Sequence, residues 1–222
     1  MYDAAIASQS DLKPHALQRV RAEARIRFKA ANGETRLADL YQSGSAKVRL
    51  PRVYGTPTTA VLINTAGGLT GGDELSFKVE ADAGTHAIVT TQTAERAYRS
   101  PAGSARVTGR FDLEGNAILE WLPQETILFD ASSLRRRLQA DLRANARLLM
   151  LESVVLGRKA MGETVGSVLF TDSWRIRRDG RLVFADDIRL DGDPAPALGG
   201  RATAGGGLAV ATLIDCAPDA ED

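Results

Sequence analysis

The chain has 222 residues, of which 44% are hydrophobic and 25% are charged, so it is neither a disordered nor a fibrous protein. Basic and acidic residues both total 28, so no net charge attracts a polyanion, and nucleic acid is not expected as a partner. No stretch approaches the roughly 20 apolar residues of a membrane-spanning helix, and the N-terminus lacks the pattern of a signal peptide. We therefore expect neither membrane insertion nor export.

The domain organisation follows from the composition along the chain. Residues 1–19 are interpreted as an N-terminal arm, residues 20–190 as a single β domain, and the Gly/Ala/Asp-rich residues 191–222 as a flexible tail. The single cysteine, Cys216, cannot form an internal disulfide, which fits a reducing compartment. The cytoplasm is the expected location.

Period-two alternation of apolar and polar residues is the main structural signal. It begins at Val20–Ala30 and recurs at residues 75–81 and 105–111, which predicts strands with one apolar face. Residues 134–142 also alternate, although Arg136 interrupts their apolar face, and we favour a strand there over an amphipathic helix.

Two further segments complete the fold prediction. The dense apolar run at residues 146–157 is either a central strand or a short helix, and Asp179-Gly180 predicts a tight hairpin between residues 174–178 and 181–188. Many short strands without helical patterns indicate an all-β fold, mainly antiparallel, with at most one or two short α-helices. A sandwich, a barrel and a stacked β architecture all remain possible on this pattern.

A glycine-rich segment, Asn64–Asp73, contains two Gly-Gly pairs that could turn backbone amides toward an anion. A phosphate-binding P-loop, however, needs a lysine followed by serine or threonine and then a helix, whereas Gly72 is followed by Asp73 and a predicted strand. We interpret the segment as a connection between two strands, with nucleotide binding as the lesser alternative.

Nucleophilic and zinc catalysis have little support. The chain has two histidines, His15 and His86, which excludes a two-histidine zinc site of conventional spacing, and no Gly-x-Ser-x-Gly motif is present. His86 is interpreted as an ordinary strand residue. No catalytic residue is assigned.

Carboxylates are the remaining chemical resource, because several stand beside apolar residues, including Glu120, Glu125, Asp130 and Glu152. A carboxylate in such a setting must be paired, protonated or hydrogen-bonded. Three interpretations stay open: an internal ion pair with an arginine, a series of oxygen ligands along an interior path for a divalent cation, and the carboxylate pair of a β-architecture carbohydrate-active enzyme. An aromatic share of 5% argues against the third, since sugar-binding platforms need exposed aromatic rings.

Four segments in sequence order, residues 64–73, 90–100, 121–130 and 156–163, resemble the urease accessory protein D family, called UreD in many bacteria and UreH in some. The resemblance spans residues 20–190 and implies a stacked, helix-like β fold without enzyme activity. It also implies a chaperone-like scaffold in nickel urease assembly, which binds apo-urease and the accessory proteins F and G, G being the GTPase. Members are thought to pass Ni(II) through an internal tunnel, with no stably bound cofactor.

The resemblance also assigns candidate site residues. Those expected to bind partners or to shape the motifs are Gly67, Gly68, Gly71, Gly72, Arg96, Tyr98, Arg99, Gly157, Arg158 and Gly162. The candidates for a transient Ni(II) path are Asp73, Glu95, Glu125, Asp130, Glu152 and Glu163. Two departures stand out: Ala131 replaces a glycine usual in the family, and beyond residue 190 the expected C-terminal elements give way to the glycine-rich tail.

Overall fold

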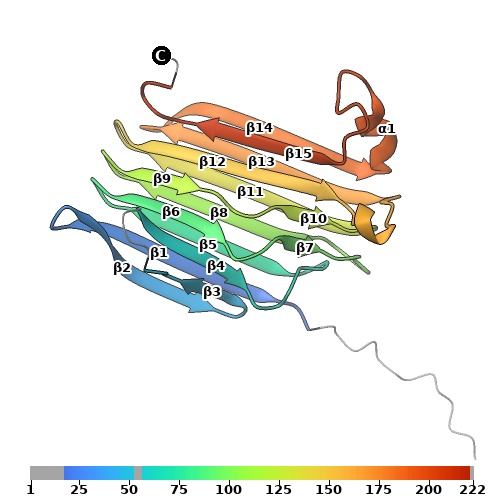
Figure 1. The fold of residues 1–222 in the computed structure, drawn as a ribbon, viewed down its shortest axis with the longest axis horizontal. Coiled ribbons are helices and arrows are strands. Elements are labelled where there is room, and N and C mark those ends of the chain that lie inside the picture. Colours follow the sequence, from blue (N-terminus) through green and yellow to red (C-terminus); the bar gives the residue numbers. More distant parts are fainter. Residues whose placement is uncertain (1–17, 53–56, 221–222) are drawn as a thin grey trace, which may run out of the picture.

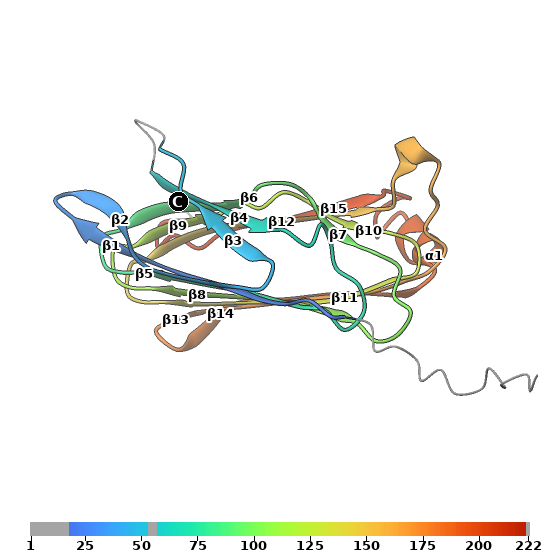
Figure 2. The same cartoon turned by 90° about the horizontal axis from the view of Figure 1, so that it is seen from below.

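The computed structural model describes residues 18–52 and 57–220, and its strands lie in two facing layers (Figures 1 and 2). The first sheet contains, in spatial order, β14 (Arg181–Gly192), β13 (Val168–Arg178), β11 (Ser132–Leu142), β8 (Ala105–Leu113), β5 (Glu74–Ala81), β1 (Arg21–Ala31) and β2 (Glu34–Ser43). The second contains β3 (Ala46–Arg49), β4 (Thr58–Asn64), β6 (His86–Thr91), β9 (Ile118–Trp121), β12 (Arg147–Leu156), β10 (Thr126–Leu128) and β7 (Glu95–Ala97). A fifteenth strand, β15 (Ala209–Asp215), pairs with β12.

From β4 to β13 the chain passes back and forth between the two sheets, so that each passage adds one rung to a stack (Figure 1). Within this part of the chain, the strands of the first sheet pair in parallel from one rung to the next, as β5 does with β8, β8 with β11 and β11 with β13. The result is a β-solenoid-like arrangement. The expected all-β, stacked architecture is confirmed, with one short α-helix, α1 (Pro194–Gly199), and one 3-10 turn, η1 (Lys159–Met161).

The expectation of mainly antiparallel pairing is wrong. Among the described residues, antiparallel pairs join β1 to β2, β3 to β4, β13 to β14 and β12 to β15, at the two ends of the stack, and the pairs between them are parallel. Alternation of side chains reports which residues share a face of a strand and carries no information about the direction of its neighbour. Because consecutive strands belong to different sheets, hydrogen-bonded neighbours run the same way.

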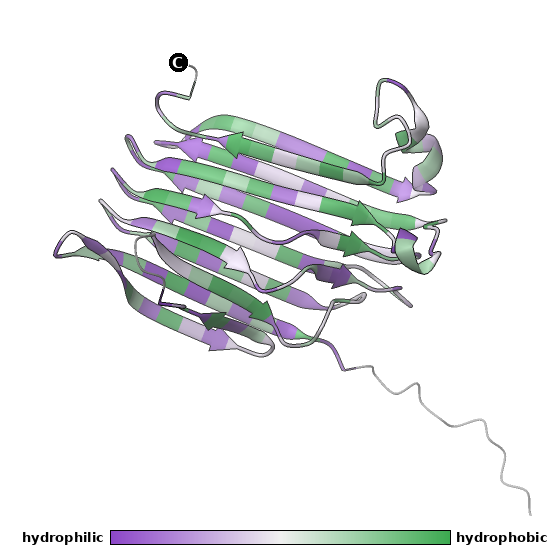
Figure 3. Ribbon diagram, viewed as in Figure 1, coloured by the Kyte–Doolittle hydropathy of each residue, from purple (hydrophilic) through white to green (hydrophobic). Residues whose placement is uncertain are grey.

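Hydrophobic and hydrophilic residues alternate along many of the strands in Figure 3, and the buried alternate residues of strands such as β1, β5, β8 and β11 form one core between the sheets. The predicted strands at residues 20–30, 75–81 and 105–111 are confirmed as β1, β5 and β8. The two ambiguous segments are also strands, β11 and β12. Buried aromatic side chains fill the core from three strands of the first sheet: Phe28 from β1, Phe111 from β8, and Phe170 and Trp174 from β13.

The hairpin between β13 and β14 is confirmed at Asp179-Gly180. The φ angles of these residues are 48° and 79°, and positive values at both central positions define the type I′ turn that matches the twist of paired strands.

The C-terminal residues differ from the predicted flexible tail. The strand β14 continues to Gly192, α1 follows it, and β15 forms an antiparallel ladder with β12 from Ala209 to Asp215. Glycine-rich composition describes the loop at residues 200–207, but the short apolar run after it finds a partner in the unpaired side of β12. Most of the N-terminal arm, residues 1–17, lies outside the described residues.

Candidate functional site

The four segments that carry the family resemblance occupy equivalent positions on successive rungs. Leu69 pairs with Ala97, Ala97 with Leu128 and Leu128 with Leu156, all in parallel and all buried. Residues roughly 30 positions apart are therefore stacked directly on one another, as the repeat of a solenoid requires. The structure brings together, at one end of the rungs, loops that the sequence separates.

Side chains from these loops form a continuous network at that end. The Tyr98 and Phe129 rings meet edge to face with their centroids 5.0 Å apart, and the Arg158 guanidinium stacks over Phe129 at 4.2 Å. Arg99 donates to Asp130 at 2.8 Å, and Arg158 donates through Nε to Glu163 at 2.9 Å. We call the side chains from these three segments the motif surface; its members are Arg96, Tyr98, Arg99, Phe129, Asp130, Arg158 and Glu163.

Two glycines of the 64–73 loop are required by close packing. A Cβ atom at Gly68 would lie 2.3 Å from a ring carbon of Tyr98 and 2.8 Å from the Arg96 carbonyl oxygen, and Gly71 is enclosed by the loop after Ser100. The interpretation of this segment as a strand-to-strand connection is confirmed, since it joins β4 to β5. Its glycines allow the rung above to sit directly on the loop.

The second sheet is interrupted at two adjacent rungs. Residues 92–94 separate β6 from β7, and residues 122–125 separate β9 from β10, whereas β12 runs unbroken beside them. Pro123 lies in the second interruption and has no N–H for a ladder hydrogen bond. We call this break in the wall the window.

Beneath the window lies a cavity of about 70 Å³, large enough for ordered water or a small ion. Exposed Gln92, Thr93 and Gln124 belong to its lining, so it reaches the surface at the window. Glu95 also lines it and accepts hydrogen bonds from Asn64 Nδ2 and from the Arg96 N–H, both at 3.0 Å. Burial raises the pKa of Glu95 above its ordinary value.

At the deep end of the cavity the two sheets are joined by a buried ionic cluster. Arg136 of β11 donates through Nε and Nη2 to Asp172, its neighbour on β13, at 3.0 and 2.6 Å. Through Nη1 it also contacts Glu152 of β12, which accepts a further hydrogen bond from Trp121 Nε1 at 2.9 Å. Burial raises the pKa of Glu152. The interpretation of Glu152 as the partner of an arginine is confirmed.

The six carboxylates assigned to a metal path do not lie together. Glu95 and Glu152 line the cavity. Glu125 lies in the second interruption of the sheet but does not line the cavity. Asp73 accepts backbone N–H groups of Val20 and Thr70, both at 2.8 Å, and Asp130 and Glu163 belong to the motif surface. Among the described residues, no group of three or more His, Cys, Asp or Glu side chains is placed to hold a metal ion.

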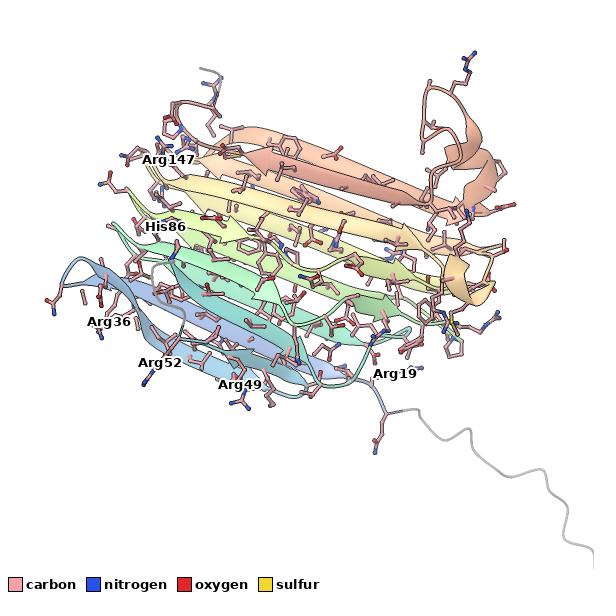
Figure 4. The ribbon with its side chains drawn as sticks, in the orientation of Figure 1. Arg19, Arg36, Arg49, Arg52, His86 and Arg147 are labelled. Carbon is pink, nitrogen blue, oxygen red and sulfur yellow. The ribbon has the colours of Figure 1, made fainter. Side chains whose placement is uncertain are left out.

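Basic side chains elsewhere do not converge on the cavity. Figure 4 shows Arg19, Arg36, Arg49, Arg52, His86 and Arg147 distributed along the periphery of the stack, and none of them lines it. His86 Nε2 lies 2.9 Å from Glu120 on the outer face of the second sheet.

The lowered pKa of Asp130 predicts that the motif surface becomes less stable in acid. Hydrogen bonds from the Gly166 and Ser167 N–H groups lower the pKa of Asp130. The ionised carboxylate therefore adds to the free energy of unfolding in full above the ordinary aspartate pKa of about 4, and this contribution is lost as the pH falls through the lower folded-state pKa. We expect Asp130→Asn to flatten the fall in thermal unfolding midpoint below that pH. The exposed Asp39→Asn, which makes no such bonds, should leave the profile unchanged, and identical profiles for Asp130→Asn and the native chain would contradict this assignment.

Comparison with known protein families shows which family the chain belongs to. Residues 20–221 match the family model described as UreD urease accessory protein. The chain belongs to the UreD family. The match extends past residue 190 and so includes α1 and β15, which the four-segment resemblance did not reach.

Curated relatives agree with this assignment. The proteins named "Urease accessory protein UreD" from Rhizobium leguminosarum bv. viciae and bv. trifolii are 48% and 50% identical over 204 residues, covering 92% of this chain and 75% of each relative. That of Agrobacterium fabrum is 46% identical over 209 residues, covering 94% of this chain and 74% of the relative. At this level of identity, the UreD fold described above applies to these relatives as well.

Sequence reasoning missed two members of the ionic cluster, Asp172 and Thr126. Asp172 interrupts the apolar face of Val168, Phe170, Trp174 and Ile176 just as Arg136 interrupts that of β11. The available signal was two interruptions of opposite charge in the apolar faces of β11 and β13, which are neighbours in the first sheet. Ala131, where a glycine was expected, has a φ of 56°, so the left-handed backbone is kept at this position although the side chain differs.

Proposed function

We propose that this chain is a urease accessory scaffold that binds apo-urease and the accessory proteins F and G and helps deliver Ni(II) to the urease active site. The observation that carries the proposal is membership of the UreD family over nearly the whole described chain. The role is non-enzymatic, because the relatives are named accessory proteins. It would be exercised in the cytoplasm, and no helix among the described residues has the length and apolarity to cross a membrane.

The interior of the stack supports the delivery part of the proposal. The window leads to a cavity whose lining includes the carboxylates of Glu95 and Glu152, which are hard oxygen ligands. Oxygen ligands bind Ni(II) less tightly than imidazole or thiolate groups, which suits transfer rather than storage. Ni(II) is the cargo here, and the half-buried Glu95 lies nearer the window than the buried Glu152.

The motif surface supports the scaffold part. It exposes Tyr98 and Arg158, whose guanidinium covers the buried Phe129 ring, and Met161 beside them is 75% exposed. Aromatic and arginine side chains are enriched where protein partners dock. We assign this end of the stack to partner binding.

The test is co-expression of the tagged chain with the urease subunits and proteins F and G from the same source. Recovery of F and apo-urease with the chain, together with nickel-dependent urease activity, is the expected result. Recovery of neither with folded chain would overturn the scaffold role.

Glu95→Gln separates delivery from binding. The variant keeps the shape of the side chain and removes the charge that attracts Ni(II), so we expect co-purification to persist while urease activation falls several-fold. Glu114→Gln, an exposed carboxylate in the turn after β8, is the matched control and should activate urease normally. Equal activation by both variants would remove Glu95 from the path.

A further inference from the structure

Two separate cavities meet at the ionic cluster. The first is the cavity beneath the window, and the second, of about 40 Å³, extends toward β14, β15 and α1, where its lining includes Ile188, Leu198 and Val210. Arg136 and Glu152 line both. The side chains of these two residues therefore form the wall between the two cavities.

The contacts of Arg136 divide it into a fixed part and a releasable part. Nε and Nη2 hold Asp172 in a two-point contact within one sheet, which fixes the planar guanidinium. Only Nη1 reaches across to the other sheet, to Glu152 and to Thr126 Oγ1 at 3.3 Å. Release of Nη1 lets the guanidinium pivot on one of its two hydrogen bonds to Asp172, and Glu152 then keeps its hydrogen bond from Trp121.

The charges within the cluster are unequal. Two buried carboxyl groups share one guanidinium, so the positive charge of Arg136 balances only one of them. The Phe170 ring, whose centroid lies 5.8 Å from the guanidinium, carries no charge. A divalent cation that arrives from the first cavity meets Glu152 and competes with Nη1 for the same carboxylate. In an interior of low dielectric the more highly charged cation has the stronger attraction.

We infer that Arg136 is a gate between the two cavities, closed while its Nη1 holds Glu152 and opened when a divalent cation takes that carboxylate. The inference rests on the proposed Ni(II) delivery and assigns its regulation to one side chain. Asp172 acts as the hinge, because it still binds the guanidinium after Nη1 has left Glu152. Passage from the window toward β15 then requires the cation that is being delivered.

Trp121 gives a direct probe, because its indole N–H is bonded to Glu152 and Ni(II) quenches nearby tryptophan fluorescence. Trp174 is the other tryptophan of the chain, so Trp174→Phe makes Trp121 the sole emitter. The full-length variant is titrated with NiCl2, with MgCl2 as the non-quenching control for ionic strength. Far-UV circular dichroism confirms that each variant is folded.

In this background we expect saturable quenching by Ni(II). Glu152→Gln should abolish it, and Glu114→Gln, an exposed carboxylate that lines neither cavity, should leave it unchanged. Arg136→Lys keeps the charge but cannot hold both carboxylates in a two-sheet contact, so it should lower the Ni(II) midpoint by about tenfold, within the usual range of coupling between two ligands. Equal midpoints for the native side chain and Arg136→Lys, or quenching that persists in Glu152→Gln, would overturn the gate.

Failure of the gate and failure of the proposed function give different results. If the complex forms and activates urease but the titrations do not depend on Arg136 or Glu152, the gate is wrong and delivery stands. If the titrations behave as expected but Glu152→Gln and Arg136→Lys activate urease like the native chain, the gate is wrong as a step of delivery. If no complex forms, the scaffold role fails irrespective of the titrations.

Discussion

Arg136→Met is expected to lower the free energy of unfolding by about 3–5 kcal/mol, because it leaves the carboxyl groups of Glu152 and Asp172 buried without their common partner. Methionine fills much of the volume of the arginine stem, so the loss reports charge rather than a cavity. Urea denaturation followed by Trp121 and Trp174 fluorescence measures it. The loss should shrink at low pH, because burial raises the pKa of Glu152 and protonation removes one of the stranded charges.

The neighbouring Arg137→Met is the matched control. Arg137 lies on the same strand but faces solvent, and a surface substitution of this kind changes stability by about 0.5 kcal/mol or less. Similar losses for the two variants would show that Arg136 contributes through strand propensity or general charge, and the buried cluster would lose its energetic role.

Replacing the whole cluster tests whether it contributes to stability or to function. Exchanging Arg136, Glu152 and Asp172 together for apolar residues of similar volume removes every desolvated charge, and such replacements are often neutral or stabilising. We therefore expect the triple variant Arg136→Met/Glu152→Leu/Asp172→Leu to regain most of the stability lost in Arg136→Met. A stable triple variant that no longer supports urease activation would place the value of the cluster in function.

The faces of the strands could be predicted from the sequence, because burial of one side of a strand imposes period two directly on the residues. Residues 134–142 show this well, since one charged interruption at Arg136 did not obscure the pattern of Leu134, Leu138, Ala140 and Leu142. The same reasoning led to the suggestion that Glu152 pairs with an arginine, because a carboxylate within an apolar run has few other options.

Which strands are neighbours could not be predicted in this way. Parallel stacking depends on residues roughly 30 positions apart, such as Leu69, Ala97 and Leu128, and one apolar residue per rung is too weak a repeat to reveal the pairing. The cavity likewise depends on two interruptions of the second sheet falling side by side, which only the register of the rungs determines. The role of Asp73 could not be predicted either, because its carboxylate accepts hydrogen bonds from backbone N–H groups that no sequence pattern marks.

Gly71→Ala is expected to cost about 3 kcal/mol, at the upper end for overpacking, because the added methyl group has no space. Its Cβ would lie 1.9 Å from Ser100 Oγ, 2.3 Å from the Ala102 carbonyl oxygen and 2.8 Å from that of Gly103. Two of these atoms are backbone, so relief requires the loop after Ser100 to move away from the rung below, and the motif surface with it. Thermal unfolding gives the stability, and co-purification of protein F measures the damage to the surface.

Gly67→Ala, in the same loop, separates steric conflict from backbone strain. Gly67 has a φ of 76°, but a Cβ there meets no atom within 4 Å, so the cost should be about 1–2 kcal/mol, that of placing alanine in the left-handed region. If Gly67→Ala proves as costly as Gly71→Ala, backbone conformation alone governs this loop. If Gly71→Ala is the more damaging and also the one that loses protein F, the tight contact between successive rungs is what gives the motif surface its shape.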